Sequence, residues 1–335
     1  MIPRTQQAAY PPSWQDELKS IITCPKVLFE ALELPLSALP SAQQAHALFK
    51  VRVTLPYLNR IKKGDLNDPL LKQVLPLEAE QSSPEHYSDD PLAESHHNPV
   101  KGVIHKYNGR VLLIAASQCA INCRYCFRRN FDYQANSPSR AQWQESLAYI
   151  HQTPSINEVI LSGGDPLVLS DSTLSWLIAQ IEQIPHITRV RIHTRLPIVL
   201  PHRITPALTT LMQRSRLNAI MVIHCNHPNE IDNDVVQALT AIKHAGITLL
   251  NQAVLLANIN NNAQTLIALS EQLFNAGVLP YYLHLMDTVK GAAHFSIPES
   301  EAIALHQQMQ ANLPGFLVPK LVREIPHRAH KTLIF

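Results

Sequence analysis

Glycine is scarce in this sequence, with 9 glycines among 335 residues. Average usage near 7% would give roughly 23, so each glycine that is present carries more information than usual. Two of the nine are adjacent, at Gly163 and Gly164. Because the pair follows an expected strand, it indicates a close approach of the backbone to a ligand, with a tight strand–helix turn as the alternative.

Long hydrophobic runs are also missing. The longest, such as Val111–Ala116, have the length of a strand, whereas a membrane-spanning helix needs about 20 apolar residues. The N-terminus has no basic start followed by an apolar core, which a secretory signal would have. We therefore expect a cytoplasmic protein with no membrane partner.

An excess of either charge is absent as well. Lys and Arg total 28, Asp and Glu total 26, and the net charge is +2. Proteins that bind duplex nucleic acid usually present a strongly basic face, so the composition predicts no nucleic-acid partner. The hydrophobic fraction of 46% is sufficient for a large core.

Cysteine is limited to five residues, and three of them fall within eight positions. A secreted disulfide framework usually has an even number of cysteines spread along the chain. Reduced thiols are therefore expected, with Cys24 as a buried structural thiol. The three clustered cysteines, Cys119, Cys123 and Cys126, need a separate explanation.

The N-terminal third differs from the rest of the chain. Helical fragments are expected at 14–22, 26–32 and 42–49, and the polar stretch 78–99 has the composition of an irregular connector. We predict three parts: a helical N-terminal extension with its connector over residues 1–104, a barrel over residues 105–331, and a tail over residues 332–335.

From about residue 105, strand-like and helix-like segments alternate every 30 residues or so, the length of a βαβ unit. Strands are expected at 111–116, 158–161, 189–193, 219–224, 247–255 and 279–285, and helices at 140–151, 172–184, 206–214, 232–244, 263–275 and 299–312. Helix N-caps are expected at Asp171, Thr205 and Asp232, and left-handed glycines past helix ends at Gly246 and Gly277. The pattern predicts an α/β fold with a parallel sheet, as a barrel, a partial barrel or a doubly wound sheet.

The three clustered cysteines form the pattern CxxxCxxC directly after the first predicted strand. Ligands in parallel α/β folds bind at the carboxyl ends of the strands. Three thiolates on one loop can hold a soft metal or an iron–sulfur cluster with one coordination position left open. A zinc site with a histidine such as His105 as fourth ligand is the alternative.

This motif, followed by repeated strand–helix units, resembles the radical S-adenosylmethionine superfamily. The resemblance implies a partial (β/α)6 parallel barrel of radical SAM type. It implies that the three cysteines hold a [4Fe-4S] cluster and that the open iron binds S-adenosyl-L-methionine. It also implies that the segment Gly163, Gly164 and Asp165, after the second strand, contacts the amino group of that cofactor.

Longer blocks resemble the lysine 2,3-aminomutase family, over roughly residues 100 to 331. They include GRVLLIAASQCAINCRYCFRRNF (109–131), LSGGDPL (161–167), LPIVLPHRIT (196–205), HCNHPNEI (224–231), LLNQAVLL (249–256) and PYYLHLMD (280–287). The resemblance implies conversion of L-lysine to β-lysine. The closest likeness is to the short bacterial branch, which implies an indirect link to elongation factor P and to its lysine ligase.

The same resemblance implies a second cofactor, pyridoxal 5′-phosphate, bound covalently to Lys331. The glycine run that commonly precedes this lysine in the family is absent, because residues 326–330 are PHRAH. Arg110 and Lys106 are implied near the cofactor phosphate. His224 and Gln252 are implied to line the pocket of the two cofactors.

A lysine substrate needs a guanidinium for its α-carboxylate and carboxylates for its ε-ammonium. By resemblance, Arg128 has the first role and Asp287 and Glu324 have the second, although lysine-specific relatives carry Asp in place of Glu324. Without the resemblance, Asp287 would be an ordinary N-cap, Glu324 a surface residue, and Lys106 and Lys331 solvated lysines.

Two alternatives stay open. An aminomutase acting on another amino acid, such as glutamate, would need a cation where Asp287 and Glu324 stand. A zinc-stabilised, non-catalytic binding protein of the translation machinery would need no cofactor. His224, Cys225 and His227 are close in sequence, but we expect them in core and turn roles rather than as metal ligands.

Overall fold

The computed structural model describes residues 13–132, 136 and 139–334. The strands in these residues form one sheet, and their spatial order follows the chain from β1 to β9. The parallel strands are β2 (Arg110–Ala116), β3 (Glu158–Gly163), β4 (Arg189–Thr194), β5 (Asn218–Ile223), β6 (Thr248–Val254), β7 (Leu279–His284) and β8 (Lys320–Arg323). Two antiparallel strands, β1 (Val103–Tyr107) and β9 (Thr332–Leu333), pair with β2 and β8 at the two edges.

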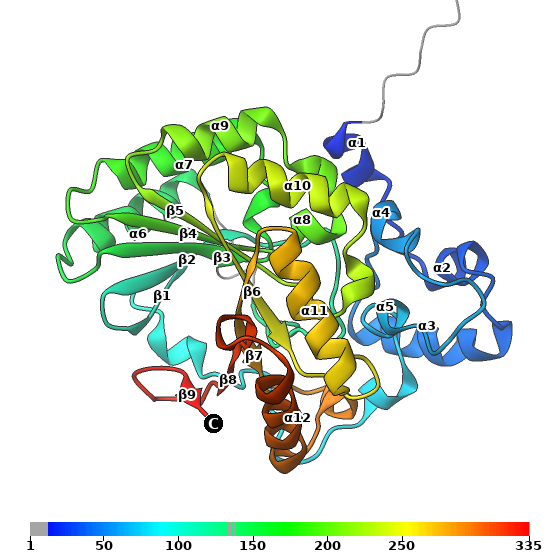
Figure 1. The fold of residues 1–335 in the computed structure, drawn as a ribbon. Coiled ribbons are helices and arrows are strands. Elements are labelled where there is room, and N and C mark those ends of the chain that lie inside the picture. The colour runs from blue at the N-terminus through cyan, green and yellow to red at the C-terminus, as the bar shows by residue number, and fades with distance from the viewer. Residues whose placement is uncertain (1–12, 133–135, 137–138, 335) are drawn as a thin grey trace, which may run out of the picture.

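One helix follows each of the six strands β2 to β7 and covers the outer face of the sheet (Figure 1). These helices are α6 (Arg140–His151), α7 (Asp171–Glu182), α9 (Pro206–Arg214), α10 (Asn233–His244), α11 (Ala263–Asn275) and α12 (Glu299–Asn312). A single-turn helix, α8 (Leu196–Val199), lies between β4 and α9. The six strand–helix units confirm the prediction of an α/β partial (β/α)6 barrel.

The sequence pattern missed β1, β8 and β9. β8 has four residues and β9 has two, so neither has a run long enough to show a periodicity. In β1 only Val103 and Ile104 are buried. The other three residues are not part of an apolar run, so the hydrophobic pattern does not indicate a strand there. The division of the chain at residues 104 and 331 stays a prediction, although the sheet extends beyond both positions.

Side chains connect the two edges of this sheet. Lys106 on β1 forms an ion pair of 2.8 Å with Glu324, which follows β8, and the hydroxyl of Tyr107 donates to the same carboxylate at 2.8 Å. Figure 1 shows the β1 and β8–β9 ends on the same side of the molecule. Because β1 and β9 are not hydrogen-bonded neighbours, the barrel is closed at this side by polar side chains rather than by backbone pairing.

Most local helix signals are confirmed. Thr205 and Asp232 cap α9 and α10, and Gly246 and Gly277 have φ of +76° and +86°. The N-cap predicted at Asp171 is wrong, because the hydroxyl of the preceding Ser170 accepts from the Thr173 N–H at 3.2 Å. Serine and aspartate are almost equally good N-caps, so an adjacent pair does not decide which one is used.

The N-terminal extension is helical, as expected. It contains α1 (Trp14–Lys19), α2 (Pro25–Ala31), α3 (Leu39–Leu48), α4 (Leu55–Leu58) and α5 (Pro69–Lys72), followed by the short 3-10 helices η2 (Glu78–Gln81) and η3 (Glu94–His97). Cys24 is exposed at the start of α2, so the prediction of a buried thiol is wrong. An N-cap position faces the end of the helix rather than its packed side, which explains the exposure.

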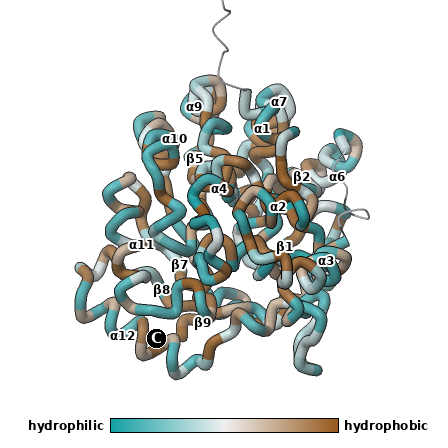
Figure 2. The backbone as a smooth tube through the Cα atoms, turned by 90° about the vertical axis from the view of Figure 1, so that its right-hand side faces the viewer, coloured by the Kyte–Doolittle hydropathy of each residue, from teal (hydrophilic) through white to brown (hydrophobic). Residues whose placement is uncertain are grey.

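The extension and the barrel share one hydrophobic core. Leu28, Phe29 and Tyr57 of the extension belong to the same cluster of buried side chains as Leu113 and Leu161 of the barrel strands. Figure 2 shows hydrophilic and hydrophobic stretches alternating along the helices, as expected for amphipathic helices that cover a sheet. None of the described helices is long and apolar enough to cross a membrane.

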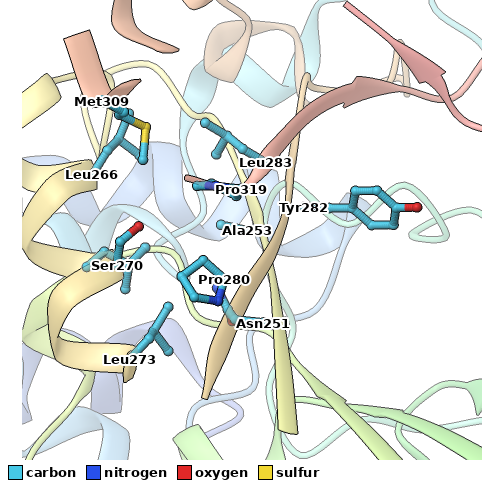
Figure 3. Close-up of a pocket in the computed structure, with 11 residues that line it drawn as sticks. Asn251, Ala253, Leu266, Ser270, Leu273, Pro280, Tyr282, Leu283, Met309 and Pro319 are labelled. Atoms are coloured by element: carbon cyan, nitrogen blue, oxygen red, sulfur yellow. The ribbon is translucent and has the colours of Figure 1, made fainter. Parts of the chain in front are cut away.

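A small crevice lies between the sheet and its covering helices. Figure 3 shows side chains of β6, β7, α11 and α12 around it, with Tyr282 pointing away from the others. Its volume of about 10 Å³ is close to the minimum for a single water molecule. The crevice is therefore a packing gap in the helix–sheet layer and has no room for a substrate.

A buried cluster of charges connects the extension to the loop that follows β2. Glu80 on η2 accepts from Arg124 Nε at 2.8 Å and from Arg129 Nη2 at 2.7 Å, and it forms a second, shorter contact with Arg124 Nη2. The side chains of Glu80 and Arg124 are fully buried, and that of Arg129 is 3% exposed. One carboxylate is thus the shared countercharge of two arginines of the cysteine loop.

Glu80→Gln should lower the free energy of unfolding by about 3–5 kcal/mol, because it leaves two buried guanidinium groups without a full countercharge. Urea unfolding of the protein under anaerobic, reducing conditions measures the change. Glu78→Gln is the matched control, because Glu78 is exposed on the same short helix. Equal unfolding midpoints for the two variants would contradict the role given to Glu80.

Candidate active site

The loop after β2 carries Cys119, Cys123 and Cys126 as free, partly exposed thiols. Burial raises the pKa of Cys119 well above its usual range and that of Cys126 to about 11, and the neighbouring thiols act in the same direction. The three sulfurs are therefore close enough to repel one another as thiolates. A soft, positively charged metal group is the ligand that such a donor set fits.

The donor arrangement distinguishes a cluster from a single ion. Among the described residues, no three Cys, His, Asp or Glu side chains converge on one metal ion. The Nδ1 of His105, the fourth ligand of the alternative zinc site, lies 2.7 Å from the Tyr149 hydroxyl. A [4Fe-4S] cluster is held by cysteine thiolates, and the three thiols of this loop are donors of that type.

The glycine pair packs directly against the cysteine loop. A Cβ on Gly164 would lie 2.3 Å from the Gln118 carbonyl oxygen, and Gly163 has a φ of +110°. The Gly164 N–H donates to Ala116 O at 2.7 Å, and the Asp165 N–H donates to Gln118 O at 2.8 Å. The glycines approach the backbone of the cysteine loop, and the close approach to a ligand that was expected here stays a prediction.

Asp165 is buried within a set of hydrogen bonds at the same place. Its carboxylate accepts from Thr194 Oγ1 and from the Arg195 N–H, each at 2.7 Å, and from the Leu167 N–H at 3.0 Å. Burial raises its pKa to about 6. Asp165 thus connects the end of β3 to the end of β4 and holds the two loops in register.

Arg195, which sequence reasoning missed, contacts the cysteine loop. Its Nη1 donates to Cys123 Sγ at 2.7 Å, and its Nη2 donates to Glu230 at 2.8 Å and to Gln73 at 2.6 Å. The signal was available, because Arg195 directly follows β4, at the edge where ligands bind in this class of fold. Gln73 had no comparable signal, since it belongs to the N-terminal extension.

Arg128 lies two residues beyond the last cysteine of the motif and is buried. Its Nε and Nη2 donate to the two carboxylate oxygens of Glu94 at 2.8 and 2.7 Å, and its Nη1 donates to Ser162 Oγ at 3.1 Å. Sequence reasoning also missed Glu94. Nothing in the polar connector marks it, since only the tertiary structure brings η3 to the cysteine loop.

Glu324 and Lys331 are in direct contact. The Glu324 carboxylate accepts from Lys331 Nζ and from Lys106 Nζ, and these two ammonium groups hold its pKa well below the usual range. The side chains of Lys106, Glu324 and Lys331 are 5%, 12% and 23% exposed. They are therefore neither surface residues nor solvated lysines.

Asp287 follows β7 and belongs to the same group. Burial raises its pKa to about 7, with a further contribution from the negative charge of Glu324. No helix begins at this residue, so it is not an N-cap. The structure thus brings together Asp287, Glu324 and Lys331, which lie up to 44 positions apart in the sequence.

Arg110 lies beside this group. Its guanidinium is 4.5 Å from the centroid of the Tyr107 ring, and the Tyr107 hydroxyl donates to Glu324. Lys106 contacts the same carboxylate. Two cationic side chains are therefore near Lys331, and their charge fits the phosphate of the implied cofactor.

Partly buried imidazoles lie at the ends of the central strands. His224 Nε2 is 3.1 Å from Gln252 Nε2, and the His193 and His224 rings are 6.2 Å apart. Burial lowers the pKa of His224 to about 3 and the pKa values of His193 and His284 well below their usual range, and the charge of Lys331 adds to each shift. These imidazoles are neutral, and the Nε2 atoms of His193 and His284 are buried without a protein partner.

The segment around Cys225 has the expected structural roles. Cys225 is fully buried, and His227 Nδ1 accepts from the Asn229 N–H at 3.1 Å to cap the short helix η6 (Pro228–Glu230). The prediction of core and turn roles is confirmed for these two residues.

Known proteins match this chain over almost its whole length. Residues 113–265 match the Radical SAM superfamily. The L-lysine 2,3-aminomutase of Haemophilus influenzae is 47% identical over 321 residues, covering 96% of this chain and 95% of that protein. The chain belongs to the L-lysine 2,3-aminomutase family. The enzyme of that name from Escherichia coli is 46% identical, with 95% and 93% covered.

Some members of the family are longer than this chain. The L-lysine 2,3-aminomutase of Clostridium subterminale is 34% identical, and the alignment covers 95% of this chain but 77% of that protein. This chain therefore resembles the shorter members in length as well as in identity. The cofactors of the family are a [4Fe-4S] cluster, S-adenosylmethionine and pyridoxal phosphate, and the cysteine loop and the Lys331 region have the donor and charge types that these groups require.

The raised pKa of Asp287 leads to a test in the cofactor-free protein. A carboxyl whose folded-state pKa is above its ordinary value lowers stability in the pH range where the unfolded chain has ionised and the folded protein has not, so the loss is absent below about pH 4, grows between pH 4 and 7 and is complete above pH 7. Asp287→Asn should match the wild type near pH 4 and be more stable by on the order of 1–3 kcal/mol at pH 8.

Urea unfolding at the two pH values measures this difference. Asp89→Asn is the control, because it makes the same change at an exposed aspartate whose contacts with Lys290 and Asn130 lie at the surface. A stability difference between Asp287→Asn and the wild type that does not change with pH would contradict the assignment.

Proposed function

We propose that this protein is a lysine 2,3-aminomutase that moves the α-amino group of L-lysine to the β-carbon, giving β-lysine. One observation carries the proposal beyond family membership. The interior of the barrel has a guanidinium, Arg128, in the loop after β2, and two carboxylates, Asp287 and Glu324, after β7 and β8. A substrate with an anionic group at one end and a cationic group at the other matches this layout.

Arg128 would bind the α-carboxylate, and Asp287 and Glu324 would bind the ε-ammonium. A substrate with a second carboxylate, such as glutamate, would bring a negative charge against these two acids. Like charges in direct contact repel by on the order of several kcal/mol in a site from which water is excluded. The acids therefore favour lysine over glutamate.

The cofactor assignments follow the same residues. Cys119, Cys123 and Cys126 would hold the [4Fe-4S] cluster, and Gly163, Gly164, Asp165, His224 and Gln252 would border S-adenosylmethionine. Lys331 would bind pyridoxal phosphate, with Arg110 and Lys106 near the phosphate. When bound, these groups supply radical chemistry at a substrate carbon and a π-system for nitrogen transfer.

The contribution of the chain itself is orientation, exclusion of water and placement of charge. Holding both ends of the substrate fixes which carbon faces the reacting group, an effect worth about 7–11 kcal/mol at best. Lys331 must leave Glu324 in order to bind its cofactor, and this releases Glu324 for the substrate ammonium. The arriving ammonium also favours the ionised form of Asp287, so we expect proton release on lysine binding near pH 7.

We place the protein in the cytoplasm and propose that its β-lysine serves the modification of elongation factor P by a lysine ligase. The support for this part is the likeness to the shorter bacterial members of the family. A non-catalytic zinc protein remains the contrasting candidate, and a visible spectrum separates the two. Anaerobically reconstituted protein should be brown and should contain iron and acid-labile sulfide, whereas a zinc protein would be colourless.

Lys331→Ala should reduce β-lysine formation by about 100-fold or more, because it removes the covalent anchor of a cofactor whose position sets the rate. The assay is anaerobic incubation with lysine, S-adenosylmethionine, pyridoxal phosphate and a reductant, followed by chromatography on a chiral phase. Iron content should be unchanged, because Lys331 pairs with Glu324 and is not one of the three cysteines that would hold the iron.

Lys320→Ala is the control for this variant, because Lys320 is an exposed lysine on β8 and should retain wild-type turnover. Full β-lysine formation by Lys331→Ala would overturn the assignment of this lysine. No β-lysine from fully loaded wild-type protein would overturn the proposed activity itself.

A further inference from the structure

Glu94 is buried beside the arginine that the proposed function assigns to the substrate carboxylate. It begins η3 in the N-terminal connector and is 8% exposed. Its two carboxylate oxygens accept from Arg128 Nη2 at 2.7 Å and from Nε at 2.8 Å. Two-point pairing of this kind fixes the plane and the direction of a guanidinium.

We propose that Glu94 is a positioning residue that orients Arg128 toward the α-carboxylate of the substrate. The inference rests on the proposed function. A guanidinium can pair with a carboxylate along either of two edges, Nε with Nη2 or Nη1 with Nη2. Glu94 takes the first edge, which directs the edge carrying Nη1 toward Ser162 at the end of β3.

Aromatic rings restrain the same guanidinium from its faces. The guanidinium carbon of Arg128 lies 4.8 Å from the centroid of the Phe127 ring and 6.0 Å from that of Phe131. Contact with a ring does not by itself fix the rotation of the guanidinium within its own plane. The paired oxygens of Glu94, together with the hydroxyl of Ser162, restrain that rotation.

The position of Glu94 is itself fixed by the turn that precedes it. Asp90 accepts from the Glu94 N–H at 2.9 Å and from the Ser95 N–H at 3.0 Å. These hydrogen bonds, with that of the Ser95 hydroxyl, lower the pKa of Asp90 and keep it ionised. The connector, which the sequence pattern describes only as irregular, thus holds a glutamate in place against the cysteine loop.

The opposite role for Glu94 would be competition. A carboxylate on Arg128 could occupy the place of the substrate and have to be displaced. The two roles predict opposite changes in the affinity for lysine when Glu94 is replaced. Removing a positioning group weakens lysine binding, whereas removing a competitor strengthens it. The pairing of Glu94 with the Nε edge, away from Ser162, favours positioning.

The experiment measures KM and kcat for lysine in Glu94→Gln and Glu94→Asp, with iron content and melting temperature as checks on folding. Loss of one charged, two-point contact should raise KM for lysine about tenfold or more in Glu94→Gln, with kcat changed less than about threefold. Glu94→Asp keeps the negative charge on a shorter side chain, so its KM for lysine should lie between the values of Glu94→Gln and the wild type. Glu85→Gln, an exposed change in the same connector, should be unaffected.

Equilibrium dialysis of labelled lysine against loaded, unreduced protein gives a second readout, and the dissociation constant should rise with KM. An unchanged or lowered KM in Glu94→Gln, with lysine turnover by the wild type, would overturn the role of Glu94 alone. If Glu94→Gln does not fold, KM for lysine in Glu94→Asp is compared with that of the wild type, and an unchanged or lowered KM would likewise overturn the role of Glu94. Absence of lysine turnover in the wild type would instead count against the proposed function.

Discussion

The site depends on charge pairs that cross from the N-terminal extension to the cysteine loop. Glu80 is the shared countercharge of Arg124 and Arg129, and Glu94 is the countercharge of Arg128. A loop with three buried arginines next to a metal-binding motif would be costly without countercharges, because an unpaired buried charge has lost its hydration. The two glutamates therefore allow the cysteine loop to be both cationic and buried.

The same principle organises the other end of the barrel. Lys106 and Lys331 both pair with Glu324, while the neighbouring Asp287 is left to take up a proton. The interior thus contains few charges, each placed against an opposite charge or kept neutral by burial. Such a site favours a ligand with a cationic end, since this end can take the place of Lys331 on Glu324 without leaving that carboxylate unpaired.

The regular part of the fold was predictable because hydrophobic periodicity reports local geometry. Six strands and six helices were found within a few residues of their true limits, and the glycine pair marked a real close contact. The edge strands β1, β8 and β9 were not found, because short or half-polar strands have no periodicity of their own. Glu94 and Gln73 were not found for a related reason, since both act only through residues far along the chain.

The sequence by itself determined the repeating strand–helix architecture, the cysteine motif and the residue types of the site, because each depends on neighbours within one turn or one loop. Only the tertiary structure decided which charges meet. It joined Lys331 to Glu324, placed Asp287 beside them and set Glu94 on Arg128. Those pairings depend on how segments that are far apart in the sequence pack against one core, and a local sequence pattern does not predict that packing.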